Sequence, residues 1–154
     1  MQKIKSKFSK KAAVLLIIAA AAILAAIVLI SGSSEISGTK YGKSHGVGLK
    51  TNDDRISFLS GLGWEVESEP ISEQDIVIPR VFSEVYSQYN ELQIQQGYDL
   101  SEYCGLEAKL YTYKVTNYPN YYGSVELSLY IMNYQVIGGD VHATAIDGFM
   151  HGLK

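Results

Sequence analysis

Four side chains near the end of the chain have the chemistry to bind a metal ion or to move a proton. Asp140 and His142 are two residues apart, so on a strand both would point to the same face, and Asp147 and His151 follow after a turn. Two imidazoles and two carboxylates can hold a metal ion if the chain folds back. The spacing matches no established ligand motif, and Asp140 can instead complete a turn or bulge after the glycine pair that precedes it. We expect no metal or other cofactor.

A thiol nucleophile would need Cys104, His142 and Asp140 as nucleophile, base and orienting group. Nucleophile elbows, phosphate-binding glycine loops and paired-histidine metalloprotease motifs do not occur in the sequence. Cys104 is the only cysteine, so it cannot form an internal disulfide, and we expect a small buried or half-buried side chain. The sequence therefore indicates a protein that is not an enzyme. A small hydrolase or metal-dependent protein using Asp140 and His142 remains the alternative.

Tyrosine is the residue type that most suggests binding. Of the 12 tyrosines, all but one lie between Tyr86 and Tyr134, and a predicted loop over residues 117–123 contains Tyr118, Tyr121 and Tyr122. A tyrosine has a large apolar ring with a polar tip, and it is enriched at binding surfaces. Strand tyrosines can equally be core residues. We expect the three loop tyrosines to form a recognition surface for an envelope protein or a cell-wall glycan.

These residues follow a long apolar segment, Ala12 to Ile30, that contains no charge, hydroxyl, glycine or proline. As a helix it would span roughly 28 Å, which is close to the thickness of a bilayer's hydrocarbon core. Five lysines precede it within residues 1–11, and such basic flanks stay in the cytoplasm. We expect a single-pass membrane anchor with residues 31–154 outside the cell membrane. A cleavable signal ending near Ser31 and Ser33 is the competing interpretation.

The external part is acidic and begins with a linker. Of 13 Lys and Arg residues five precede the anchor, so 8 remain against 16 acids, a formal charge of -8. Nucleic acid and anionic lipid are therefore not expected partners. Half of residues 31–50 are Gly or Ser, which is typical of a flexible linker. Residues 51–154 are enough for one compact external domain.

The hydrophobic period predicts the elements of this domain. Thr51 and the acids after it signal the start of a helix, and residues 64–67 and 76–78 read as two short strands. A main helix is expected from about Pro79 or Arg80 to Gln96, with Gly97 ending it, and Asp99 can cap a further short turn. Three alternating segments, 109–116, 125–131 and 136–145, predict consecutive antiparallel strands.

The expected fold class is α+β, in the order α-β-β-α-β-β-β. An antiparallel sheet would pack on the face of the main helix that carries Phe82 and Leu92.

Six ordered sequence blocks in the domain are distinctive: GWEVESEP at 63–70, DIVIP at 75–79, VYSQYNELQIQQGYDL at 85–100, YTYKVTNYP at 111–119, VIGGDV at 136–141 and DGFMHGL at 147–153. Together they resemble a known bacterial family, the domain of unknown function 4830. The resemblance covers about residues 52–154 and implies a small, N-terminally anchored envelope protein of Gram-positive bacteria. It implies no activity, cofactor or catalytic residue.

Overall fold

A computed structural model describes residues 48–154 of the chain. The expected basic N-terminus at 1–11, the membrane helix at 12–30 and nearly all of the linker lie outside these residues. Among the helices of residues 48–154, none is both long and apolar enough to cross a bilayer.

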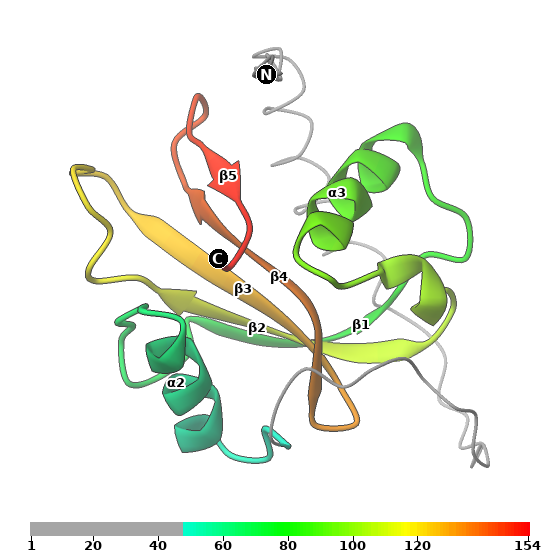
Figure 1. Cartoon of the computed structure of the whole chain (residues 1–154), viewed down its shortest axis with the longest axis horizontal. Coiled ribbons are helices and arrows are strands. Elements are labelled where there is room, and N and C mark those ends of the chain that lie inside the picture. The colour runs from blue at the N-terminus through cyan, green and yellow to red at the C-terminus, as the bar shows by residue number, and fades with distance from the viewer. Residues whose placement is uncertain (1–47) are drawn as a thin grey trace.

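The domain is α+β, with two helices and a five-stranded antiparallel sheet in the order β1-β2-β3-β4-β5 (Figure 1). In chain order the elements are α2 (Asn52–Gly61), β1 (Ser72–Val77), α3 (Glu84–Gln95), the 3-10 helix η2 (Leu100–Tyr103), β2 (Glu107–Lys114), β3 (Val125–Met132), β4 (Gln135–Ala143) and β5 (Met150–His151). The predicted meander of three long strands is confirmed. It is extended by β5, which the sequence did not reveal because two paired residues give no alternating pattern.

Helix α2 starts where the sequence predicts. Thr51 accepts a hydrogen bond from the Asp54 amide, and the Asp54 carboxylate accepts one from the Thr51 amide, which completes a capping box. The helix ends at Gly61, and Gly63 has a positive φ of 94° that turns the chain away.

Helix α3 begins later than predicted, at Glu84 and not near Pro79 or Arg80. Ser83 is the N-cap and accepts the Tyr86 amide, because its side chain can replace a missing helical acceptor whereas those of Pro79 and Arg80 cannot. The predicted end is confirmed, since Gly97 has a φ of 89° just after the last turn. Asp99 caps the predicted short turn, which is η2.

The expectation of two strands before the main helix is wrong. Residues 64–67 form only one isolated bridge, between Val66 and Val115, so β1 is the single strand there. The Trp64 indole donates a 2.7 Å hydrogen bond to the Leu153 carbonyl, and the Glu65 amide donates to the side chain of Asn117 instead of to a strand. Alternation of polar and apolar residues over four positions was too short to specify a strand.

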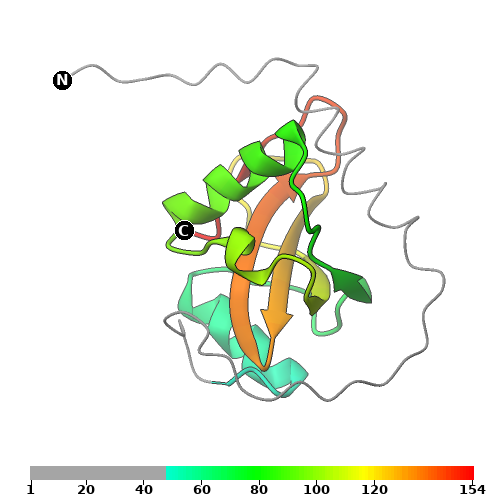
Figure 2. The same cartoon turned by 90° about the vertical axis from the view of Figure 1, so that its right-hand side faces the viewer.

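The sheet separates two hydrophobic clusters, so both of its faces are covered (Figures 1 and 2). On the α2 face, Leu59 packs with Tyr113, Leu127 and Leu129. On the α3 face, strand residues pack against α3 and η2. This second cluster consists of Ile76, Ile78, Tyr86, Tyr89, Leu100, Ala108, Tyr130 and Ile137. The predicted covering of one face by α3 is confirmed in outline, while α2 covers the other face. Strand tyrosines 111, 113 and 130 are core residues.

The folded part extends into the segment that composition assigns to the linker. Leu49 is buried, and its amide donates a 2.6 Å hydrogen bond to the Tyr134 carbonyl in the β3–β4 turn. The preceding chain therefore joins the domain at this end of the sheet.

Candidate functional site

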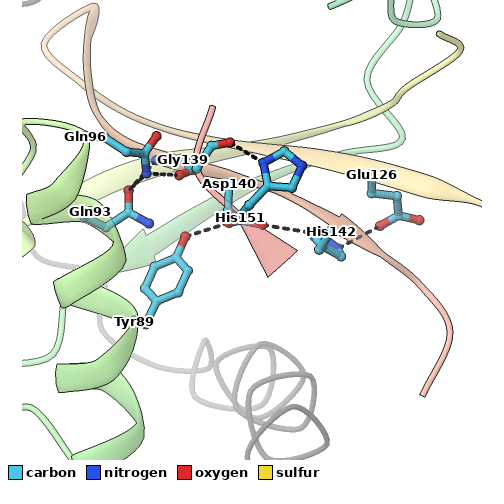
Figure 3. Close-up of polar contacts among 9 residues, drawn as sticks. Tyr89, Gln93, Gln96, Glu126, Gly139, Asp140, His142 and His151 are labelled. Atoms are coloured by element: carbon cyan, nitrogen blue, oxygen red, sulfur yellow. Dashed lines mark hydrogen bonds and ion pairs between the residues drawn. The ribbon is translucent and has the colours of Figure 1, made fainter. Parts of the chain in front are cut away.

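A chain of polar contacts crosses from α3 to the sheet (Figure 3). The Tyr89 hydroxyl donates a 2.6 Å hydrogen bond to Oδ2 of Asp140, and Nδ1 of His142 donates to Oδ1 of the same carboxylate at 2.7 Å. Nε2 of His142 lies 3.7 Å from Oε2 of Glu126 on β3. Asp140 is buried, and Glu126 is directly opposite His142 in the strand register.

The electrostatics of this contact chain favour a charged histidine. Burial by itself lowers the pKa of His142, but the hydrogen bond to Asp140, the contact with Glu126 and the two negative charges raise that pKa to about 10. Burial beside the Asp140 carboxylate raises the pKa of Tyr89 well above its ordinary value, so its hydroxyl stays a donor. At neutral pH the group is therefore an imidazolium held between two carboxylates.

This arrangement is poorly suited to catalysis by His142. A general base needs a free ring nitrogen near the proton it takes, and a metal ligand needs a neutral ring. Here one nitrogen is bonded to Asp140 and the other faces Glu126. The contacts instead have a structural role: Asp140 on β4 binds Tyr89 of α3, and His142 beside it faces Glu126 of β3.

The structure does not bring the four candidate metal ligands together. His151 is opposite Val141 in the β4–β5 register, so its side chain lies on the α2 face, whereas Asp140 and His142 lie on the α3 face. Asp147 is exposed in the loop between the two strands. Within residues 48–154 no group of three or more His, Cys, Asp or Glu residues is arranged to hold a metal ion.

The expected burial of Cys104 is wrong, because its thiol is exposed. Cys104 directly follows η2, and Gly105 after it has a positive φ of 78°, which makes a surface turn. The structure records no contact between Cys104 and either His142 or Asp140 among the described residues.

The three predicted binding tyrosines differ in their environments. Tyr118 lies inside an aromatic cluster, stacked on Phe149 with ring centroids 4.5 Å apart and parallel to Trp64 at 5.9 Å. His151 adds a hydrogen bond. Its Nδ1 lies 2.6 Å from the Gly152 carbonyl, which can only accept, and its Nε2 lies 3.1 Å from the Tyr118 hydroxyl, which donates to it when the ring is neutral. Tyr118 is therefore half-buried and supports the loop.

Tyr121 packs against the domain and holds the loop in place, whereas the side chain of Tyr122 points into solvent. The Tyr121 ring packs edge-on against Tyr118 and Phe149. A Cβ at Gly123 would lie 2.6 Å from this ring, so only glycine lets the chain pass over it. The side chain of Asn117 holds the base of the loop through bonds to the Glu65 amide and the Gly63 carbonyl. Tyr122 is fully exposed.

A second exposed apolar residue lies on the neighbouring loop. The Thr144 amide donates a 3.1 Å bond to the Ser124 carbonyl, which joins the β4–β5 loop to the end of the tyrosine loop. Ile146 in the β4–β5 loop is 75% exposed. Sequence reasoning did not select Ile146, because an isolated isoleucine among loop residues carries no signal of its neighbours in space.

Two glutamines of α3 make a contact that sequence reasoning also missed. Gln93 accepts the Gly139 amide at 2.8 Å, and Gln96 donates to the Gly139 carbonyl at 3.0 Å (Figure 3). Gln96 also accepts the Leu153 amide at 2.6 Å. Its carboxamide therefore replaces a peptide group between β4 and the C-terminal segment. Gly138 and Gly139, expected to form a turn or bulge with Asp140, lie within β4 and pair with Tyr130 and Leu129, directly after a register shift at Ile137.

Fold and site together define a small α+β domain, with a sheet between two helices, a buried Asp–His contact and an aromatic cluster below two exposed loops. Residues 58–141 match the family described as "Domain of unknown function (DUF4830)", and the chain belongs to this family. The resemblance found from the sequence blocks is thus confirmed at the level of the family. No curated protein and no solved structure matches the chain.

Proposed function

We propose that this protein is a non-catalytic binding module of the cell envelope, anchored by Ala12 to Ile30 and acting through Tyr122 and its neighbours. The observation that carries the proposal is a fully exposed tyrosine on a loop fixed by side-chain contacts. A loop backbone that is already held in one place loses little entropy when a ligand covers its exposed ring, which favours binding. Tyr118 and Tyr121 contribute by supporting the loop, and an envelope protein or a cell-wall glycan is the expected ligand.

The position of the loops fits a tethered protein. Leu49 bonds to the β3–β4 turn, whereas the β2–β3 loop, which contains Tyr122, and the β4–β5 loop, which contains Ile146, lie at the other end of the same strands (Figure 1). The eight residues of β3 separate these ends by roughly 25 Å at about 3.3 Å per residue. A flexible tether that enters the domain at residue 48 would therefore leave both loops uncovered.

The alternative is a small envelope hydrolase or a metal-dependent protein that uses Asp140 and His142. The carboxylate contacts at both nitrogens of His142, and its raised pKa, count against this alternative. The aromatic loop favours binding.

The test is site-specific crosslinking in living cells with the tagged full-length chain. A photo-reactive phenylalanine analogue replaces Tyr122 in one sample and Val81, which is 85% exposed on a different part of the domain, in the control. We expect a crosslinked product from position 122 that position 81 does not give. Loss of that product on protease treatment would indicate a protein ligand, and loss on muralytic digestion a glycan. Equal products from both positions, or none from 122, would contradict the proposal.

A further inference from the structure

The two edges of the sheet differ in how their outward backbone groups are hydrogen-bonded. At the β4 edge, β5 pairs with Val141 and His142, and beyond β5 the side chains of Gln93 and Gln96 bond to the amide and carbonyl of Gly139. At the opposite edge lies β1, which among residues 48–154 pairs with β2 alone (Figure 1). An exposed strand edge is a template for pairing with another chain.

The outward groups of β1 follow from its pairing. Ile78 donates its amide to the Leu106 carbonyl at 3.0 Å, and in an antiparallel ladder this orientation alternates along the strand. The amides of Glu73, Asp75 and Val77 therefore point away from β2. Within residues 48–154 no group hydrogen-bonds these three amides. Pro70 and Pro79 flank the strand and limit this free edge to the residues between them.

The edge is acidic, with an apolar residue at each end. Residues 56–79 contain no Lys or Arg, and five acids lie within them between Glu65 and Asp75. Lys109 bridges Glu73 at 2.9 Å and Asp75 at 3.0 Å, Lys114 pairs with Glu67, and the charge of Arg55 also acts on Glu73, so three cations oppose the five acids. The Asp75 side chain remains 80% exposed. Ile71 and Val77 are each more than half exposed.

We propose that β1 is a docking edge for an extended basic peptide, which adds to the sheet as a sixth strand. Backbone bonds to the outward amides and carbonyls would supply the affinity, and cationic side chains opposite Glu73 and Asp75 would supply the selectivity. The same charges disfavour a second copy of this chain, because edge-to-edge pairing would place acid against acid. Because side chains alternate along a strand, the fitting sequence has a basic residue at every second position.

The experiment uses the full-length chain in a non-ionic detergent and a fluorescent peptide in which lysine alternates with valine. We expect saturable binding that weakens as salt is raised, and slower hydrogen exchange at the amides of Glu73, Asp75 and Val77. A peptide with glutamate in place of each lysine should bind at least tenfold more weakly. Absence of binding, binding that leaves exchange in β1 unchanged, or a dimer of the chain protected at β1 would overturn the proposal.

Two variants localise the binding. Asp75→Pro removes one outward amide and the ion pair with Lys109, but no backbone bond to β2, so it should abolish binding while thermal unfolding stays cooperative. Asp75→Lys reverses the charge and should weaken binding at least tenfold. Glu91→Lys, at an exposed acid on α3, is the charge-matched control and should bind like the wild type. If Asp75→Pro does not fold, Asp75→Lys and the exchange pattern of the wild type decide the question. Equal binding by Asp75→Lys and Glu91→Lys would also overturn the proposal.

Discussion

The hydroxyl of Tyr89 and the carboxylate of Asp140 are joined by a 2.6 Å hydrogen bond across 51 residues of sequence. The same carboxylate accepts the Nδ1 proton of His142. One buried acid thus connects the covering helix with the most C-terminal long strand. Because a buried charge is costly without partners, removing either partner should weaken the whole domain.

Asp140→Asn should destabilise the domain by about 3 kcal/mol, since it leaves the His142 imidazolium without its closest negative partner. Urea unfolding of the full-length chain in non-ionic detergent at pH 7 measures the change. Asp147→Asn is the matched control, because Asp147 is exposed, and it should change the free energy of unfolding by less than about 0.5 kcal/mol. Equal losses in the two variants would show that Asp140 has no special role.

Stability should fall as the pH rises above neutrality. The pKa of His142 is about 10 in the folded domain against 6.5 for the free side chain, so its contribution is complete below pH 6.5 and is lost as the pH rises through about 10. Unfolding at several pH values between 6 and 10 measures the slope. His142→Gln should remove the part of the slope that belongs to this residue and leave the part caused by tyrosine ionisation. An identical slope in His142→Gln would contradict the raised pKa.

Two glycine substitutions should have opposite effects. A Cβ at Gly139 would lie 2.6 Å from the Ser128 carbonyl oxygen and 2.7 Å from Leu153, so Gly139→Ala should cost about 2 kcal/mol. A Cβ at Gly61, in the last turn of α2, meets nothing within 4 Å. Gly61→Ala should therefore stabilise the domain by about 0.5 kcal/mol, because alanine has less freedom to lose on folding. Thermal unfolding of both variants provides the comparison, and a shared direction of change would contradict the geometry.

Gln96→Ala should release the C-terminal segment from β4. The variant loses the bonds to Gly139 and Leu153, which we expect to cost about 2 kcal/mol. Hydrogen exchange at residues 150–153 should become faster, while exchange in β2 and β3 stays slow. Gln95→Ala, at the exposed neighbouring position, is the control and should leave exchange unchanged. Unchanged exchange in Gln96→Ala would mean that β5 holds the segment alone.

Tyr118→Ala and Tyr122→Ala should differ in their effect on the free energy of unfolding, because Tyr118 supports the loop and Tyr122 is exposed on it. The Tyr118 ring stacks on Phe149, and its hydroxyl is hydrogen-bonded to His151. Loss of this side chain should therefore lower the free energy of unfolding by about 3 kcal/mol. Tyr122 is fully exposed, and its loss should change the free energy of unfolding by less than about 0.5 kcal/mol. Thermal unfolding distinguishes them. A large loss in Tyr122→Ala would assign this residue to the fold and remove it as a binding residue.

The candidate site was only partly predictable. The tyrosine loop was evident from composition, but the division between Tyr118 as support and Tyr122 as exposed ring depends on Trp64 and Phe149, which lie far away in sequence. His142 and Asp140 were correctly expected on one face of a strand. Their partners Tyr89 and Glu126 were not expected, because neither spacing nor residue type indicates which helix turn lies over which strand.

The sequence by itself determined the local structure. The capping residue Thr51, the stop at Gly97 and the alternation along β3 act over a few neighbours, so each could be read directly. Tertiary structure decided what required contacts between distant segments: the exposure of Cys104 and the separation of His151 from Asp140 and His142 on opposite faces of the sheet. Strand pairing assigns each side chain to a face, and only the folded chain fixes which strands pair.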